Sequence, residues 1–287
     1  MTSLSLIGVG RIGGEVAFLA SFLGIVDELN MNDVNTTLLH AQISDLKHAM
    51  PGLEITTGLE AAMRSEICIF TAGIPRNPLV PSRADLLKDN LPVAVRYSER
   101  LRGYRGILIT VTNPSDILNY QLSTRAEINP SRCIGFGGQL DSARFAGELI
   151  SRGIKGEAWV LGEHGEHQVP IFSILGSEVG LEEREEIRKT LRSASMGVIA
   201  GKGGTIYGPA AHITELISAI VDDTQGTYAC SCILDGEYGI SGCSIGVPAV
   251  IGEGGILEIE EWSLDEWERK HLEEGAQFLK DSIKSTG

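Results

Sequence analysis

The strongest constraint on the fold is a glycine-rich turn between a short apolar strand and a helix. Residues 4–9 are apolar and run into Gly8-Val-Gly10-Arg-Ile-Gly13, and a helical pattern then continues to residue 24. In this context the first glycine permits a tight turn, and the second lets the backbone approach a bound group. The third lets the helix pack closely on the strand. We therefore expect a βαβ unit whose helix N-terminus faces an anion.

The alternation of strands and helices continues through the first half of the chain. Residues 29–33 form a weak second strand in which polar and apolar side chains alternate, and residues 67–71 and 107–111 form cleaner strands rich in Ile and Val. Short strands separated by helices indicate parallel βαβ units. The predicted fold class is therefore α/β, with a doubly wound parallel sheet of the Rossmann type over residues 1–139.

The pattern changes after about residue 140. Residues 182–200 have the spacing of a long amphipathic helix, and residues 214–221 continue as an apolar helical stretch. Residues 231–257 are rich in Gly and β-branched side chains, which favours antiparallel strands. We expect residues 140–287 to form a second, α+β domain that binds substrate and packs closely against the first.

The last helix has a predicted start at Ser263. With Glu266 three residues later, Ser263 has the spacing of a capping box. The apolar face of this helix is expected to include Trp267, Leu272, Leu279 and Ile283.

Composition excludes several classes of protein. The 287 residues carry a net charge of −14, which argues against nucleic acid and anionic membranes as partners. The start of the chain lacks the basic segment of a signal peptide, and the apolar run at residues 16–25 is too short to cross a bilayer. We therefore expect a cytoplasmic protein.

The cysteines have no metal-binding spacing. Their odd number and the absence of a CxxC pair predict small buried thiols in a reducing compartment and no dedicated metal site. They are Cys68, Cys133, Cys230, Cys232 and Cys243.

Asp33 strengthens the case for a dinucleotide at the glycine turn. It lies at the end of the second predicted strand, where a carboxylate accepts hydrogen bonds from the ribose hydroxyls of a dinucleotide. Residues 30–40 contain no Arg or Lys to compensate a 2′-phosphate, so we predict NAD rather than NADP. The alternative interpretation is an ordinary strand–helix turn and a surface aspartate.

Asp141, Arg144 and His164 carry the predicted chemistry. A carboxylate on one imidazole nitrogen fixes the tautomer and stabilises the imidazolium, so the pair can move a proton to or from a substrate oxygen. Arg144 follows Asp141 by three residues, so both project from one helix face, and its guanidinium fits a carboxylate. Taken singly, these residues are better explained as a solvated pair and a loop histidine. The catalytic interpretation is favoured only because a nucleotide motif and a second pair of arginines occur in the same chain.

A second pair of arginines is expected at the same rim. Arg76 and Arg83 flank a polar loop with two prolines that follows the strand at residues 67–71, and Asn113 ends the strand at residues 107–111. Because the carboxyl ends of parallel strands form the ligand-binding edge of such a sheet, the loop is a candidate lid. The alternative is a pair of surface arginines.

Ordered motifs along almost the whole chain resemble those of the lactate/malate dehydrogenase family, most of all its archaeal-type malate dehydrogenases. Besides Asp33 and the glycine turn, they are Thr71-Ala-Gly-Ile-Pro-Arg76, Val111-Thr-Asn-Pro114, Gln139-Leu-Asp-Ser-Ala-Arg144, Gly162-Glu-His-Gly165, Gly204-Thr-Ile-Tyr-Gly-Pro209, Gly236-Glu-Tyr-Gly-Ile240 and Gly246-Val-Pro248.

The resemblance implies a role for each motif. His164 would donate and accept the proton with Asp141 as its partner, Arg144 would bind the C1 carboxylate, and Arg83 would polarise the carbonyl. Arg76 would select malate or oxaloacetate, while Asn113 and Thr205 would help bind substrate. The implied NAD-binding residues are Gly8, Gly10, Arg11, Ile12, Gly13, Asp33, Gly73, Asn90, Val111 and Asn113. The resemblance also implies a homodimer or homotetramer and a place in the tricarboxylic acid cycle.

Two segments depart from the family pattern. The loop from Arg76 to Arg83 is one residue longer than in the family, and Gly165-Glu-His167 replaces the usual Gly-Asp-Ser. His167 is expected to be an inert neighbour, although it could add a second titration near the site. Two other functions stay open at this point: a dehydrogenase of lactate or another 2-hydroxy acid, and an NAD-binding regulatory protein without catalysis.

Overall fold

The computed structural model describes residues 2–77, 79–80 and 82–286, and its N-terminal half is a parallel sheet with helices on both faces. Its strands are β1 (Ser3–Ile7), β2 (Glu28–Asn32), β3 (Glu54–Thr57), β4 (Ile67–Phe70), β5 (Ile107–Thr110) and β6 (Cys133–Gly135). Its helices are α1 (Arg11–Phe22), α2 (Thr36–Ala49), α3 (Leu59–Ala62), η1 (Ala84–Leu86), α4 (Leu87–Arg100), α5 (Ser115–Ala126) and η2 (Pro130–Arg132). The strand order β3-β2-β1-β4-β5-β6 confirms the doubly wound arrangement.

The second half adds antiparallel strands to the same sheet. Its elements are α6 (Gly138–Arg152), β7 (Val160–Gly162), β8 (Gln168–Pro170), α7 (Leu181–Lys202), α8 (Tyr207–Val221), β9 (Gly226–Asp235), η3 (Glu237–Gly239), β10 (Ser241–Gly252), β11 (Gly255–Ile259) and α9 (Glu266–Ser285). β9 joins β6 through Gly135 and Ser231, and the order continues through β10 and β7 to β8, with β11 beside β10. The predicted antiparallel strands are confirmed.

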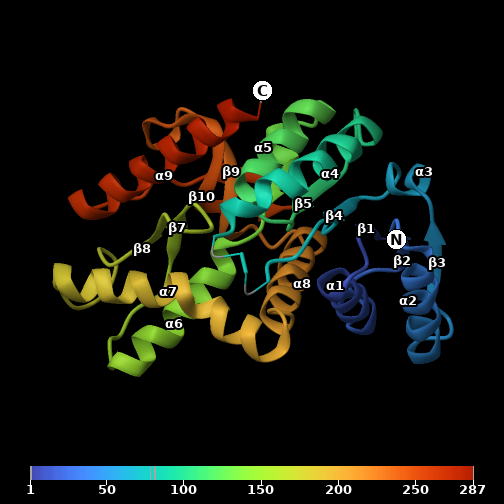
Figure 1. Ribbon diagram of the computed structural model, residues 1–287, viewed down its shortest axis with the longest axis horizontal. Helices are drawn as coiled ribbons and strands as arrows, with labels where there is room; N and C mark the ends of the chain where they lie inside the picture. Colours follow the sequence, from blue (N-terminus) through green and yellow to red (C-terminus); the bar gives the residue numbers. More distant parts are fainter. Residues whose placement is uncertain (1, 78, 81, 287) are drawn as a thin grey trace.

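The parallel strands are apolar on both faces because helices cover both. In β1, Leu6 packs into the core shared with α1 and α8, whereas Ile7 packs into the core shared with α4 and α5. In β4, Ile69 packs into the first of these cores and Phe70 into the second. Figure 1 shows α4 beside α5 on one face and α1 beside α8 on the other. A strand buried on both faces reads as a continuous apolar run, which is why β1, β4 and β5 were predictable.

The polar side chains of β2 form hydrogen bonds inside the sheet. The Asn30 amide donates to Thr56 Oγ1 at 3.0 Å and accepts from Ser5 Oγ at 3.0 Å, and Asn32 Oδ1 accepts from the Gly58 amide at 2.9 Å. These bonds offset the cost of burying amide groups, so the weak predicted strand is a real one.

The cysteines and the apolar helices were the subject of two expectations from composition. All five cysteines are free and buried, as predicted. Among the described residues, no helix combines the length and the apolar character needed to cross a bilayer.

The predicted start of the last helix was wrong by two residues. The N-cap is Asp265, whose Oδ1 accepts from the Glu268 amide at 2.9 Å, while Glu268 Oε2 accepts from the Asp265 amide at 3.0 Å. Ser263 lies before the helix and Glu266 is its first residue. Both serine and aspartate have the capping-box spacing here, and tertiary contacts of Glu268 decide between them. The predicted apolar face is confirmed, since its four residues pack on the core.

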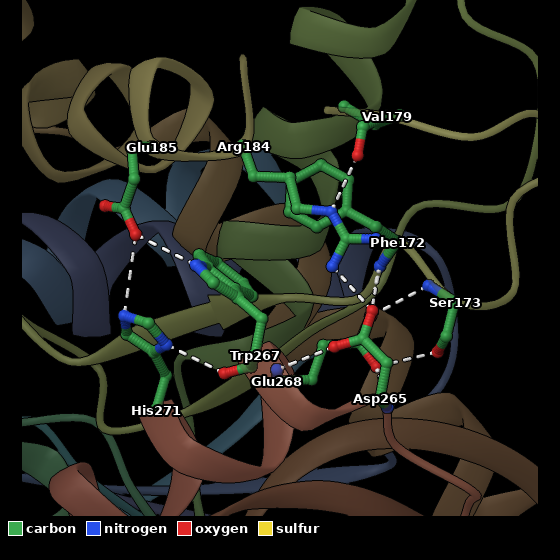
Figure 2. A network of polar contacts seen from close by, with 9 residues as sticks. All are labelled: Phe172, Ser173, Val179, Arg184, Glu185, Asp265, Trp267, Glu268 and His271. Carbon is green, nitrogen blue, oxygen red and sulfur yellow. Dashed lines mark hydrogen bonds and ion pairs between the residues drawn. The ribbon is translucent and has the colours of Figure 1, made fainter. Parts of the chain in front are cut away.

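Glu268 joins the start of α9 to the segment after β8. Its Oε1 accepts from the Phe172 and Ser173 amides at 2.6 and 2.8 Å, and its Oε2 accepts from Ser173 Oγ at 2.7 Å (Figure 2). Arg184 of α7 donates to Asp265 and lies over the Phe172 ring. This network fixes α9 against α7 and the β8 segment.

Removing the Glu268 carboxylate should destabilise the protein. In Glu268→Ala, the Phe172, Ser173 and Asp265 amides lose a buried acceptor, so we expect a loss of roughly 2–4 kcal/mol in the free energy of unfolding. Urea denaturation followed by circular dichroism measures it. Glu273→Ala, on the exposed face of the same helix, is the control. Equal stability of the two variants would contradict this account of the network.

Candidate active site

The carboxyl ends of the parallel strands face a partly open cavity of about 70 Å³. The predicted residues in its wall are Ile12, Arg76, Arg83, Val111, Asn113, Arg144, His164 and Thr205. Sequence reasoning missed Phe136, Leu140, Ser195, Ile199 and Pro209. Ser195 and Ile199 come from the C-terminal half of α7. The apolar pattern of this helix predicts a core face but cannot say that part of that face borders a cavity.

Asp141 and His164 form a buried pair at the edge of this cavity. Asp141 lies in the first turn of α6, His164 follows β7, and His164 Nδ1 is 2.6 Å from Asp141 Oδ2. The residues are 1% and 8% exposed. A Cβ at Gly137 would lie 2.4 Å from His164 Cγ, so only glycine allows the imidazole to approach the start of α6 this closely.

Asp141 also binds Arg144, so one carboxylate serves both an imidazole and a guanidinium. Arg144 Nη1 donates to Asp141 Oδ1 at 2.8 Å. Burial alone would raise the pKa of Asp141, but His164, Arg83 and Arg144 together bring that pKa well below its usual range. The carboxylate is therefore ionised at every ordinary pH, as the orienting partner of an imidazole must be.

The His164 imidazole is poised to change charge. Burial lowers its pKa, Asp141 raises it, and Arg83 and Arg144 lower it further, so that the net shift is downward. At neutral pH the ring is neutral, and with Nδ1–H donated to Asp141 its Nε2 accepts a proton. An anion bound between the two arginines would offset their charge and favour the imidazolium.

Arg76 and Arg83 bring positive charge to the same cavity. Arg76 Nε donates to the Val80 carbonyl at 3.0 Å and Nη1 donates to Ser195 Oγ at 3.4 Å, so the loop contacts α7. Burial and the neighbouring Arg83 lower the pKa of Arg76. Arg83 is itself buried. Pro78 and Pro81 of the predicted lid lie outside the described residues.

Asn113 and Asn90 have different positions. Asn113 lines the cavity, and its buried Oδ1 has no partner among the described residues, which suits a ligand donor. Asn90 is fully buried beneath the loop that contains Gly73. Its amide accepts from the Ile74 amide at 2.6 Å and donates to the Asn113 carbonyl at 2.8 Å. Asn90 therefore supports the backbone on both sides of the cavity.

The glycine turn has the shape that a dinucleotide requires. Gly8 has φ of +94°, and a Cβ on Gly13 would lie 2.1 Å from the Gly8 carbonyl oxygen. A Cβ on Gly10 would meet nothing within 4 Å, so the space beside the N-terminus of α1 is open to a phosphate. Asp33 Oδ2 accepts from the Val9 amide at 2.9 Å, which fixes the carboxylate beside the turn.

Arg11 reaches across the molecule from this turn. Its side chain is exposed, and its Nη1 donates to the Lys202 carbonyl, at the end of α7, at 3.3 Å. The guanidinium thus lies between the N-terminus of α1 and the C-terminus of α7. Sequence alone could place Arg11 only in the turn.

His167 packs beside the catalytic segment. Its ring stacks on Phe278 of α9 with centroids 4.6 Å apart, and its amide donates to Glu163 Oε2 at 2.9 Å. Neither contact brings the ring into the wall of the cavity.

Comparison with known proteins accounts for both halves of the chain. Residues 2–135 match the NAD binding domain of lactate/malate dehydrogenases, and residues 139–286 match the alpha/beta C-terminal domain of the same proteins. The first match bears out NAD as the cofactor, since the residues of the glycine turn fit it.

The sequences of individual relatives align with this chain over nearly their whole length. The chain is 36% identical to a malate dehydrogenase of Natronomonas pharaonis, covering 98% of each protein, and 30% identical to an L-lactate dehydrogenase 1 of Bacillus cereus, covering 97% of this chain and 96% of that protein. The structure of an Archaeoglobus fulgidus malate dehydrogenase in complex with NADH superposes with a TM-score of 0.89 at 30% identity, covering 99% of both chains. This chain belongs to the lactate/malate dehydrogenase family.

Proposed function

We propose that the protein is an NAD-dependent malate dehydrogenase, which transfers hydride reversibly between the nicotinamide and C2 of malate or oxaloacetate. The observation that carries this proposal is that Arg76 and Arg144 line one cavity together with His164. Two guanidinium groups in one cavity suit a substrate with two carboxylates.

Each proposed catalytic residue has one task. Bound NAD accepts or supplies the hydride. Arg144 holds the C1 carboxylate, Arg83 polarises the C2 oxygen, and His164 Nε2 takes the hydroxyl proton during oxidation or returns it during reduction. Asp141 keeps the Nδ1 proton in place and stabilises the imidazolium. Asn113 and Thr205 border the substrate, and the glycine turn with Asp33 holds the dinucleotide.

Arg76 is the residue that favours malate over lactate as the substrate. Overall similarity supports the same choice, because the chain is 36% identical to the malate dehydrogenase of Natronomonas pharaonis and 30% identical to the L-lactate dehydrogenase 1 of Bacillus cereus. Oxaloacetate places a carboxylate opposite Arg76, whereas pyruvate places a methyl group there. Oxaloacetate can therefore form an ion pair with Arg76 that pyruvate cannot form, and loss of a buried ion pair costs on the order of 3–5 kcal/mol.

Steady-state kinetics with NADH or NADPH and oxaloacetate, pyruvate or a bulkier 2-keto acid test the proposal. We expect kcat/KM for oxaloacetate to exceed that for pyruvate by at least roughly a hundredfold, and Arg76→Gln to narrow this gap. Comparable rates on both keto acids would contradict the assignment of Arg76. NADH binding without oxidation by any 2-keto acid would instead support a regulatory protein.

The two glycines of the turn give a second test. A methyl group at Gly10 enters open space, so Gly10→Ala should keep the wild-type Tm but weaken NADH binding, by roughly tenfold or more, as it blocks the phosphate. Gly13→Ala meets the Gly8 carbonyl and should lower the Tm instead. Gly147→Ala, on the exposed face of α6, is the control. NADH fluorescence and thermal melts separate the effects, and unchanged NADH affinity in Gly10→Ala would argue against this position for the cofactor.

Asp141→Asn tests the proton relay. The amide presents a donor or an uncharged acceptor to Nδ1, so we expect kcat to fall by about 10²–10⁴. Reduction of oxaloacetate needs the imidazolium and is lost as pH rises through the His164 pKa. Losing the carboxylate lowers that pKa further, so the high-pH limb of the profile should move to lower pH. Glu148→Gln on the same helix should leave the profile unchanged, and an unchanged profile in Asp141→Asn would refute the pairing.

We propose a nucleotide-binding domain over residues 1–139 and a substrate domain over residues 140–287, and the two family matches support a boundary near this point. The absence of basic residues near Asp33 supports NAD over NADP. A homodimer or homotetramer in the cytoplasm, serving the tricarboxylic acid cycle, is proposed from the family resemblance, and sedimentation would establish the oligomer.

A further inference from the structure

We propose that Asp116 is a positioning residue for the proton relay, because its carboxylate ties the backbone of His164 to the helix that follows Asn113. The inference rests on the proposed function and adds a residue to the same site. Asp116 does not line the cavity, and nothing in the sequence motif around Asn113 gives it a task.

The geometry joins two segments that carry cavity residues. Asp116 lies in the first turn of α5, three residues after Asn113. Its Oδ2 accepts from the His164 amide at 2.8 Å, and the residue is 2% exposed. One buried side chain therefore sets the position of His164, on the β7 segment, relative to Asn113, on the β5 segment. A displacement of a catalytic group by about 1 Å can lower the rate a hundredfold, so this hydrogen bond affects the rate of the reaction.

Asp116 lies in a crowded group of titratable side chains. Glu163 from the β7–β8 turn faces it, as do Asp141 from α6 and the Cys243 thiol from β10. The Glu163 carboxylate is itself buried and accepts from the His167 amide. The groups that favour the charged form of Asp116 are the hydroxyl of Ser231 from β9 and the His164 amide. The charge of Lys280 from α9 lowers the pKa of the Cys243 thiol, although burial raises that pKa overall.

This environment makes the charge of Asp116 depend on pH near neutrality. Burial, reinforced by Glu163, raises the pKa of Asp116 to about 7. Above that pH the carboxylate binds the His164 amide more strongly and adds a negative charge behind the imidazole. Below it, a neutral acid accepts the same hydrogen bond more weakly. The hydrogen bond from the His164 amide to Asp116 therefore strengthens as pH rises through about 7.

Asp116→Asn separates charge from shape. The amide oxygen can still accept from the His164 amide but never becomes charged, so the variant imitates protonated Asp116. We expect its kcat for oxaloacetate reduction to lie within about twofold of wild type at pH 6 and roughly tenfold below it at pH 8.5. KM for oxaloacetate and the fluorescence-measured Kd for NADH should each change by less than about twofold. A loss of kcat that is independent of pH, or a loss confined to KM or Kd, would overturn the proposal.

Glu268→Gln is the matched control. Glu268 is also a buried carboxylate that accepts from backbone amides, but those amides belong to Phe172 and Ser173 (Figure 2). It should lower the Tm while its kcat relative to wild type stays constant between pH 6 and 8.5. A pH-dependent loss in Glu268→Gln equal to that in Asp116→Asn would mean that general destabilisation explains both, and the proposal would fail.

Glu163→Gln keeps the proposal testable if Asp116→Asn does not fold. It retains an acceptor for the His167 amide but removes the like charge that faces Asp116, so the pKa of Asp116 should fall. Its kcat should then exceed that of wild type between about pH 6 and 7 and match it above pH 8. A profile superimposable on wild type would overturn the proposal. If the wild type does not oxidise NADH with oxaloacetate at all, the proposed function fails, and this inference fails with it.

Discussion

The candidate site depends on one buried carboxylate, that of Asp141, shared between an imidazole and a guanidinium. Burying a charge is costly unless it is paired and hydrogen-bonded, and Asp141 meets both conditions through His164 and Arg144. Local structure places both Arg144 and His164 next to this carboxylate. Helical spacing supplies Arg144, and Gly137 gives the His164 ring room at the start of α6. The sheet supplies the rest, because β6 and β7 bring both segments to one edge.

The charge around the cavity then constrains the substrate. Three guanidinium groups, from Arg76, Arg83 and Arg144, border the cavity, while the Asp141 carboxylate lies behind them. This group of guanidinium side chains suits a dicarboxylate better than a monocarboxylate. Burial, together with the charges of Arg83 and Arg144, lowers the pKa of His164 and keeps the ring neutral, and a bound anion would favour its protonated form. Substrate binding and protonation of the imidazole are thus linked through a shared set of charges.

Sequence reasoning succeeded where a residue type has one physical use in its context. The glycine turn, the apolar strands and the Asp141–His164 pair are of this kind, and the structure brings the paired residues together. It failed where two residues compete for one task. Ser263 and Asp265 both precede a glutamate at capping-box spacing, and only the contacts of Glu268 with the β8 segment choose Asp265.

Other features could not be predicted because they depend on burial between distant segments. The contact between Asp116 and the His164 amide joins residues 48 positions apart, and neither residue type marks it in the sequence. The contribution of α7 to the cavity through Ser195 arises in the same way, since a helix pattern shows which face is apolar but not what that face borders.

Proton uptake on ligand binding tests the linkage of charge and protonation most directly. Calorimetry of a non-reducible dicarboxylate analogue of oxaloacetate, binding to the NADH complex at pH 7.5, would be repeated in buffers of different ionisation enthalpy. The account predicts uptake of about one proton, because His164 is neutral before the anion binds and charged afterwards. Tight binding without proton uptake would contradict it.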